Sequence, residues 1–327
     1  MSDLTTLYMG LKLRNPIIAA SCSLTNTVDN IRKCEKAGAG AIVLKSLFEE
    51  QIQAEGRNLA DGSHPSWHPE AFDYLSKAAM EMSESEYLRL VKGAREHVSI
   101  PIIASLNCIS AEGWMDYAEK LQNVGADALE INVALLPSDP KRSAAEIEDG
   151  YYRIIEKLRK QIRIPIALKI GPYFTSMTRI AAESVFRGIN ALVLFNRFYL
   201  FDIDLERLKT VPGSRFSGPD EYHQSLRWTA LLAGRYKLDI SASTGIHDAQ
   251  TALKFILAGA TTIQLCSVLY RHGVDHIGTI LNGMTEWMSR HSIASLADIR
   301  GKLSQMQSPE PELFERLQYI KALVGIE

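Results

Sequence analysis

Two lysines stand at the ends of apolar segments, an unusual place for a charged side chain. Lys45 ends the run GAIVLKS, and Lys169 lies near the end of IPIALKI. Because lysine is almost never fully buried without a partner, two lysines facing one place predict an anion or another ligand that satisfies both charges. For either lysine alone, a side chain that reaches solvent at the rim is an equal explanation. A Schiff-base lysine of an aldolase-type enzyme is a third one.

Polar or reactive residues also end other apolar segments. Four segments follow a glycine and end, seven or eight positions later, in Lys45, Asn132, Asn196 and Cys266. A glycine at a helix C-cap explains how each segment starts, but it does not explain why each one ends in a polar group. We therefore interpret these end residues as functional.

Two later turns have the composition of a phosphate site. Ser243-Thr244-Gly245 and Cys266-Ser267 each close an apolar segment. Backbone N–H groups at the start of a helix bind phosphate well. Gly245 could serve only the turn, but we favour phosphate because a (β/α)8 barrel binds it after its seventh and eighth strands.

The elements that position these residues alternate regularly. Eight apolar runs cover 15–21, 40–46, 100–107, 128–133, 164–170, 191–196, 238–244 and 261–267. Segments of helical period cover 27–37, 84–97, 111–124, 143–162, 174–187, 220–235, 247–258 and 272–290, and Ser110 and Gly125 are expected to cap the third of them. This alternation predicts an α/β fold, a (β/α)8 TIM barrel, in which the carboxyl ends of the strands meet at the active site.

We expect one domain over residues 1–327. The barrel covers about 15–290, and a helical tail follows over about 291–327. Two insertions, 47–83 and 197–219, interrupt the plan after the second and sixth strands. Long loops at the carboxyl ends of barrel strands usually line or cover the site.

The composition restricts the class of partner. Hydrophobic residues make up 46% of the chain, charged residues 23%, and the formal net charge is −2. This balance argues against nucleic acid or an anionic membrane as the main partner. The sequence has no uninterrupted apolar run of about 18 residues and no basic region followed by an apolar stretch at its start. We expect a cytoplasmic protein with no membrane partner.

The common cofactor and metal motifs are absent. None of the four cysteines (Cys22, Cys34, Cys108 and Cys266) belongs to a C-x-x-C pair, which argues against a zinc site or an iron–sulfur cluster within the chain and for free thiols. Neither G-x-G-x-x-G nor G-x-x-x-x-G-K-[ST] occurs. The spacing of His64 with His68, and of His272 with His276, suits a metal, but no third ligand accompanies either pair, and we expect ordinary surface or loop histidines.

Several of these segments together resemble the dihydroorotate dehydrogenases, above all the class 1 type, over about Leu7 to Leu303. GLKLRNPIIAAS is similar to the family's opening G-L-x-x-x-N-P-I-x-x-A-S. GAIVLKS and IPIALKIGPYF resemble the strands of its two flavin-contacting lysines, and ALVLFN and FSGP resemble its asparagine strand and the glycine loop that follows. ASTGIHDAQTALKFILAGATTIQLCSVLY is similar to its phosphate-binding stretch.

The resemblance implies an FMN-dependent dehydrogenase acting on CH–CH groups, one that oxidises dihydroorotate or a related dihydropyrimidine, as in pyrimidine biosynthesis. It also implies a homodimer. The implied substrate contacts are Asn132 and Asn196, to which we add Arg197, in a position where the family has serine. The implied FMN contacts are Ala20, Ser21, Lys45, Ser105, Asn132, Lys169, Asn196, Ser217, Gly218, Ser243, Thr244, Gly245, Cys266 and Ser267.

The chain departs from the family where the catalytic base belongs. The fourth strand reads INVALLPSD, so Ala134 and Leu135 occupy the positions of the family's Ser and Cys. Leucine cannot accept a proton, and Ser138 is the candidate substitute, although a serine between Pro137 and Asp139 is more often a turn residue. The family's N-S-M-G-L-P-N substrate loop is also missing, and Cys22, Thr244 and Cys266 replace family residues. We therefore expect weak or altered dihydroorotate oxidation; a flavin-binding paralogue without catalysis and a lysine-dependent aldolase remain alternatives.

Overall fold

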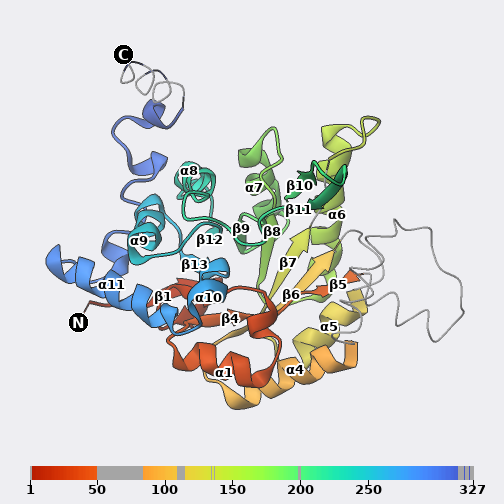
Figure 1. The fold of residues 1–327 in the computed structure, drawn as a ribbon, viewed down its shortest axis with the longest axis horizontal. Coiled ribbons are helices and arrows are strands. Elements are labelled where there is room, and N and C mark those ends of the chain that lie inside the picture. The colour runs from red at the N-terminus through yellow and green to blue at the C-terminus, as the bar shows by residue number, and fades with distance from the viewer. Residues whose placement is uncertain are drawn as a thin grey trace, which may run out of the picture.

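The computed structural model describes residues 2–49, 84–108, 115–133, 135, 137–197, 200–315, 320 and 324, with only the backbone of Cys108. Eight parallel strands form its centre, and helices surround them (Figure 1). The strands are β3 (Ile17–Ala19), β4 (Ala41–Val43), β6 (Ile102–Cys108), β7 (Ala128–Val133), β8 (Ile166–Ile170), β9 (Ala191–Leu194), β12 (Asp239–Ala242) and β13 (Thr262–Leu265). Each strand pairs with the next, and β13 pairs with β3, so the sheet closes on itself. The predicted (β/α)8 TIM barrel is confirmed.

Every predicted helical segment contains a helix. The helices are α1 (Val28–Lys36), α4 (Glu84–His97), α5 (Met115–Asn123), α6 (Ala144–Gln161), α7 (Met177–Phe186), α8 (His223–Leu232), α9 (Ala249–Ala258) and α11 (His276–Arg290). Local sequence sets several ends: Ser143 and Glu146 form a capping box at the start of α6, and Gly259, at φ 113°, ends α9. Gly125 follows α5 at φ 99° as expected, whereas Ser110 lies outside the described residues.

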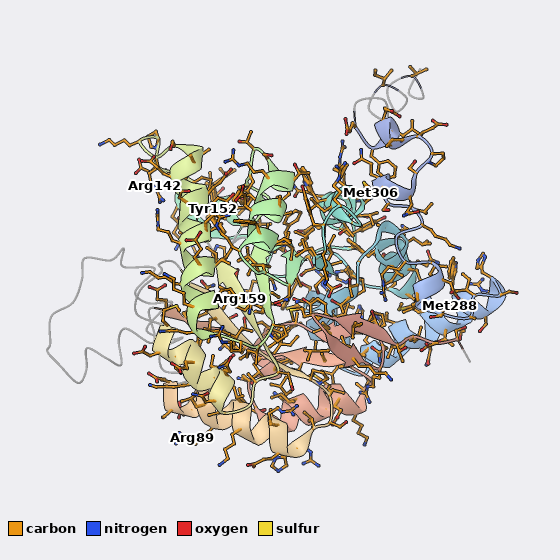
Figure 2. All side chains as sticks on the ribbon, turned by 180° about the vertical axis from the view of Figure 1, so that it is seen from behind. Arg89, Arg142, Tyr152, Arg159, Met288 and Met306 are labelled. Carbon is orange, nitrogen blue, oxygen red and sulfur yellow. The ribbon has the colours of Figure 1, made fainter. Side chains whose placement is uncertain are left out.

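The helices pack onto the barrel and onto one another. Tyr152 and Arg159 lie along α6 in Figure 2, on the side of α7. The Arg187 guanidinium at the end of α7 stacks 4.2 Å from the centre of the Tyr152 ring, and Arg159 donates to the carbonyl of Gly188 at 2.7 Å. Among the described residues, no helix is both long and apolar enough to span a bilayer.

An N-terminal hairpin closes one end of the barrel. It consists of β1 (Thr6–Tyr8) and β2 (Leu11–Leu13), joined by Met9 and Gly10 at φ 53° and 83°. Two residues with positive φ are typical of a type I′ turn. Tyr8, Met9 and Leu13 are buried against the first residues of the barrel strands, so the hairpin seals the amino ends of the strands. The sequence prediction missed this hairpin, whose two strands have only three residues each.

Three further elements differ from the predicted pattern. The insertion 197–219 contains an antiparallel hairpin, β10 (Phe201–Asp204) and β11 (Lys209–Pro212). A short strand, β5 (Leu47–Phe48), adds to β6 at the start of the other insertion. The segment before α11 forms a separate helix, α10 (Ser267–His272), which ends at Gly273 with φ 82°.

Short 3-10 turns complete the described chain. One, η1 (Ser23–Thr25), follows β3, and three lie in the tail: η2 (Leu296–Asp298), η3 (Gln305–Gln307) and η4 (Pro311–Phe314). The tail is held to α9, because Gly301 and Leu303 donate backbone hydrogen bonds to Ile256 and Leu257.

Candidate active site

A cavity of about 200 Å³ opens at the carboxyl ends of the barrel strands. Cofactor and small-molecule sites are concave and carry a few convergent polar groups. Ten of the fourteen residues proposed for FMN line it: Ala20, Ser21, Lys169, Asn196, Ser217, Ser243, Thr244, Gly245, Cys266 and Ser267. The other described lining residues are Phe195, Arg197, Arg215, Ile246 and Gln264.

The charged side chains that line the cavity are all cationic, although two of them pair with carboxylates outside the lining. Lys169, Arg197 and Arg215 contribute side chains, and no described lining residue is an aspartate or glutamate. The remaining lining groups are mostly hydroxyls, amides and a thiol. Hydroxyls, amides and cations are the groups that proteins use to bind phosphate or carboxylate. The arrangement therefore favours an anionic ligand with several hydrogen-bonding groups.

Lys169 has a carboxylate partner within the barrel. Its Nζ lies 3.5 Å from Oε1 of Glu130 on β7 and 3.3 Å from Oε1 of Gln264 on β13. Gln264 Nε2 in turn donates to Glu130 Oε2 at 2.5 Å. Glu130 is only 1% exposed and does not line the cavity, whereas Lys169 and Gln264 do, so the carboxylate supports these two residues from beneath. The sequence interpretation that Lys169 needs a ligand to neutralise it was incomplete, because Glu130 supplies part of that neutralisation.

Two of the predicted asparagines meet at the mouth. Asn132 ends β7 and Asn196 follows β9, and the Asn196 side-chain amide donates to Asn132 Oδ1 at 3.0 Å. Asn196 lines the cavity, whereas Asn132 lies behind it as the hydrogen-bond partner. The pair presents amide groups that complement the N–H and C=O edge of a cyclic amide.

Serine hydroxyls connect three neighbouring strands, following β3 and β4 and lying within β6. Ser21 Oγ lies 2.9 Å from Ser46 Oγ, which lies 2.7 Å from Ser105 Oγ. Ser105 is held from outside by Tyr87 of α4, whose hydroxyl donates to the Ser105 carbonyl at 3.1 Å. Lys45, adjacent to Ser46, is half-buried at the end of β4 and is not among the lining residues.

The loops after β11, β12 and β13 converge on the expected phosphate side. Ser217 Oγ accepts from the Gly245 amide at 3.1 Å and donates to Ser267 Oγ at the same distance. Thr244 and Gly245 have φ angles of 75° and 72°. A Cβ on Gly245 would lie 2.5 Å from the backbone nitrogen of Tyr222, so the turn packs closely against the segment leading into α8. Gly218 is adjacent but does not line the cavity, and its amide donates to Glu221.

Arg197 is fixed by an acidic residue beside the mouth. Its Nε and Nη2 donate to the two carboxylate oxygens of Glu221 at 2.8 and 3.2 Å, and Nη1 donates to the Ser214 carbonyl at 2.7 Å. This arginine lowers the pKa of the Glu221 carboxyl. Arg215, by contrast, is exposed at the mouth and has no ion pair among the described residues. Sequence reasoning missed Arg215, although it lies only two residues before Ser217.

The position of the missing base faces away from the cavity. Leu135 packs against α6, with its Cδ1 3.4 Å from where a Cβ on Gly150 would lie. It lines a small separate pocket with Tyr151 and Phe174. Ser138 is exposed in the loop before α6 and does not line the cavity. Its role as substitute base stays a prediction.

The histidines form no described metal site. The rings of His272 and His276 stack with their centres 5.0 Å apart, and His276 Nε2 lies 3.0 Å from the His247 carbonyl. No group of three potential metal ligands occurs within the part of the chain that the structure describes. His64 and His68 lie outside it.

Comparison with known proteins gives a consistent assignment. A model of the family described as dihydroorotate dehydrogenase matches residues 71–288. The chain is 25% identical to a putative dihydroorotate dehydrogenase A (fumarate) of Aeropyrum pernix, covering 91% of this chain and 97% of that protein. It is 26% identical to the dihydroorotate dehydrogenase B (NAD(+)) catalytic subunit of Thermoplasma acidophilum, covering 92% and 99%.

A plant relative is named for a different activity. The chain is 22% identical to the chloroplastic dihydropyrimidine dehydrogenase (NADP(+)) of Arabidopsis thaliana, covering 96% of this chain and 80% of that protein. These relatives are oxidoreductases, and the family model spans most of the barrel, including β7, β8, β9, β12 and β13. The resemblance noted from strand-end motifs is therefore confirmed: this chain belongs to the dihydroorotate dehydrogenase family.

Proposed function

We propose that this protein is an FMN-dependent oxidoreductase that acts on a CH–CH bond of a dihydropyrimidine-like substrate, with weak activity toward dihydroorotate. The observation that carries the proposal is the cavity at the strand ends, with three cations and no carboxylate among its described lining residues. A flavin mononucleotide has a phosphate and a polar ring edge, and this set of groups suits both.

The proposed FMN contacts divide into two groups. Ser243, Thr244, Gly245, Cys266 and Ser267 would hold the phosphate. Lys169 and Asn196 would contact the ring, whose reduced form is anionic. When bound, the flavin supplies hydride acceptance, for which protein side chains are unsuited.

The remaining proposed contacts lie close to lining residues. Asn132 bonds to Asn196, and Ser105 connects through Ser46 to Ser21. Lys45 and Gly218 belong to the same rim. We keep these four as proposed contacts of the flavin or the substrate.

The substrate class follows from the amide pair. Asn132 and Asn196 would hydrogen-bond the N–H and C=O groups of a dihydropyrimidine ring. Relatives are named for dihydroorotate and for dihydropyrimidine oxidoreduction, and both names imply this ring. Arg215 would attract an anionic substituent if the substrate carries one.

The missing base sets the expected rate. Proton transfer by a positioned side chain typically contributes about 10²–10⁴ to a rate. Leu135 cannot take a proton and packs against α6, so dihydroorotate oxidation should be slower by a factor of this order than in an enzyme with a base there. If Ser138 replaces the base, its loop has to approach the cavity, and Ser138→Ala would then lower the rate further.

Purified protein tests the proposal directly. We expect yellow protein that releases FMN on denaturation, and anaerobic bleaching of the bound flavin by a dihydropyrimidine. Dihydroorotate and dihydrouracil should be compared, since they differ in the carboxylate. Protein that lacks pigment and does not bind added FMN at micromolar concentration would refute the proposal; bound flavin that no dihydropyrimidine reduces would favour a non-catalytic flavin-binding protein.

The aldolase alternative has less support. A Schiff-base lysine attacks as a free amine, whereas Lys169 Nζ is engaged in an ion pair 3.5 Å from the Glu130 carboxylate. Borohydride trapping with an aldehyde substrate should leave this lysine unmodified.

A further inference from the structure

Two cysteines lie at the carboxyl ends of neighbouring barrel strands. Strands β3 and β13 are parallel partners, with Ala19 opposite Leu265. The Ala20 amide continues this pairing with a 2.9 Å hydrogen bond to the Leu265 carbonyl. Cys266 therefore stands beside Ala20, and Cys22 follows two residues later. Both cysteines therefore lie at the same end of two neighbouring strands.

A tyrosine ties together the two segments that carry these thiols. Tyr270, one turn beyond Cys266 in α10, accepts from the Ser23 amide at 2.9 Å, and its hydroxyl lies 2.5 Å from Ser23 Oγ. In the same turn, Thr25 Oγ1 donates to the Cys22 carbonyl at 2.9 Å. Both thiols are thus held by fixed local structure.

The pair has the environment of a reactive thiol. Both cysteines are half-buried and neither is in a disulfide, and Cys266 lines the cavity. The hydrogen bond from Cys266 lowers the pKa of the Cys22 thiol, and the charge of Lys169 acts in the same direction. A lowered thiol pKa increases the thiolate fraction, which is the nucleophilic form.

We propose that Cys22 and Cys266 form a redox-active dithiol that a hydroperoxide oxidises to an intramolecular disulfide. The Cys22 thiolate attacks one peroxide oxygen, the O–O bond breaks, and a sulfenic acid and one water (or alcohol) result. The Cys266 sulfur then attacks the sulfenic sulfur, the S–O bond breaks, and a second water leaves. Two thiols lose two electrons and two protons, and the peroxide takes up both. The product joins the ends of β3 and β13 at the edge of the cavity.

A third thiol among the described residues provides an internal control. Cys34 is fully buried in α1, with its Sγ 3.9 Å from the Leu24 carbonyl. Burial, with a smaller effect from Cys22, raises the pKa of Cys34 to about 11. It should therefore react much more slowly, although it belongs to the same region.

The test is a peptide map of the full-length purified protein. The protein is first reduced, the reductant is removed, and stoichiometric hydrogen peroxide is added. Remaining thiols are alkylated and the protein is digested with trypsin without reduction. Arg32 and Lys33 separate Cys22 from Cys34, so the two fall on different peptides. We expect a Cys22–Cys266 cross-linked peptide that forms at least about tenfold faster than Cys34 is oxidised. Cys34→Ser should leave the cross-link intact, whereas Cys22→Ser and Cys266→Ser should each abolish it.

A dimedone label should then trap the sulfenic acid on Cys22 in the Cys266→Ser variant. The proposal is overturned by a Cys22–Cys34 cross-link, by disulfides between chains, or by oxidation of the cysteines at similar rates without the expected peptide. If a serine variant does not fold, the map of the wild-type protein still decides, because it needs no substitution. Formation of the cross-link does not require flavin, so the dithiol proposal can fail or succeed independently of the proposed function.

Discussion

Replacing Glu130 by glutamine should destabilise the protein much more than an ordinary surface change. The substitution keeps the size of the side chain but removes the charge that lies 3.5 Å from Lys169 Nζ. At this distance, with an effective dielectric constant of about 20, the attraction is about 5 kcal/mol. Relief from burying the carboxylate offsets part of it, and the loss of one partner of a buried pair typically costs about 3–5 kcal/mol. We expect a loss of about 3 kcal/mol.

Urea unfolding of wild-type and Glu130→Gln protein measures this loss, provided that both transitions are two-state and have similar slopes. The matched control is Glu156→Gln. Glu156 pairs with Arg187 at the shorter distance of 2.8 Å, but its side chain is 53% exposed, and an exposed pair contributes only about 0–1 kcal/mol. Burial rather than distance should thus decide the size of the effect.

The double variant Glu130→Gln/Lys169→Met completes the cycle. Removing both charges leaves no uncompensated ammonium, so the double variant should be more stable than the sum of the two single losses implies. Equal losses for Glu130→Gln and Glu156→Gln, or strictly additive effects in the cycle, would contradict the idea that Lys169 depends on Glu130.

Two further predictions concern the rim of the cavity. Gly245→Ala should lower the free energy of unfolding by more than about 1 kcal/mol, because φ is 72° and the new Cβ would lie 2.5 Å from the Tyr222 nitrogen. The control is Gly273→Ala, which has a similar φ of 82° but no atom within 4 Å of the new Cβ, and so measures the backbone strain alone. Equal melting temperatures for the two variants would contradict the packing argument. Arg197 lowers the pKa of Glu221, so their pair should stabilise the fold above the usual carboxyl pKa and lose that effect as pH falls through the lowered value. Glu221→Gln should therefore lower the melting temperature slightly at pH 7 and not at about pH 2–3, the effect being below about 1 kcal/mol for so exposed a pair; a difference that persists in acid would count against the ion pair.

The barrel could be predicted because its strands are buried on both faces and its helices alternate with them at regular intervals. The place of the site followed from the fold, since the carboxyl ends of parallel strands must meet. The Glu130 triad was missed because its members come from β7, β8 and β13, and no local pattern joins residues 134 positions apart. A signal was present, however: Glu130 lies two residues before Asn132, so both project into the barrel.

Other features depended on contacts between distant segments. The partner of Arg197, Glu221, lies beyond a hairpin that the sequence showed only as an insertion. Leu135 could be recognised as unable to act as a base, but its packing against Gly150 could not be inferred from the strand motif alone. The homodimer implied by the family resemblance remains a prediction.

The N-terminal hairpin has a consequence for kinetics. Because Tyr8, Met9 and Leu13 fill the opposite end, the described part of the barrel admits a ligand from the carboxyl ends of the strands. Under the proposed function, a reductant and a small-molecule oxidant that react at the same flavin face would have to enter the cavity one after the other. Initial-rate plots against the two reactants should then give parallel lines, the pattern of a ping-pong reaction.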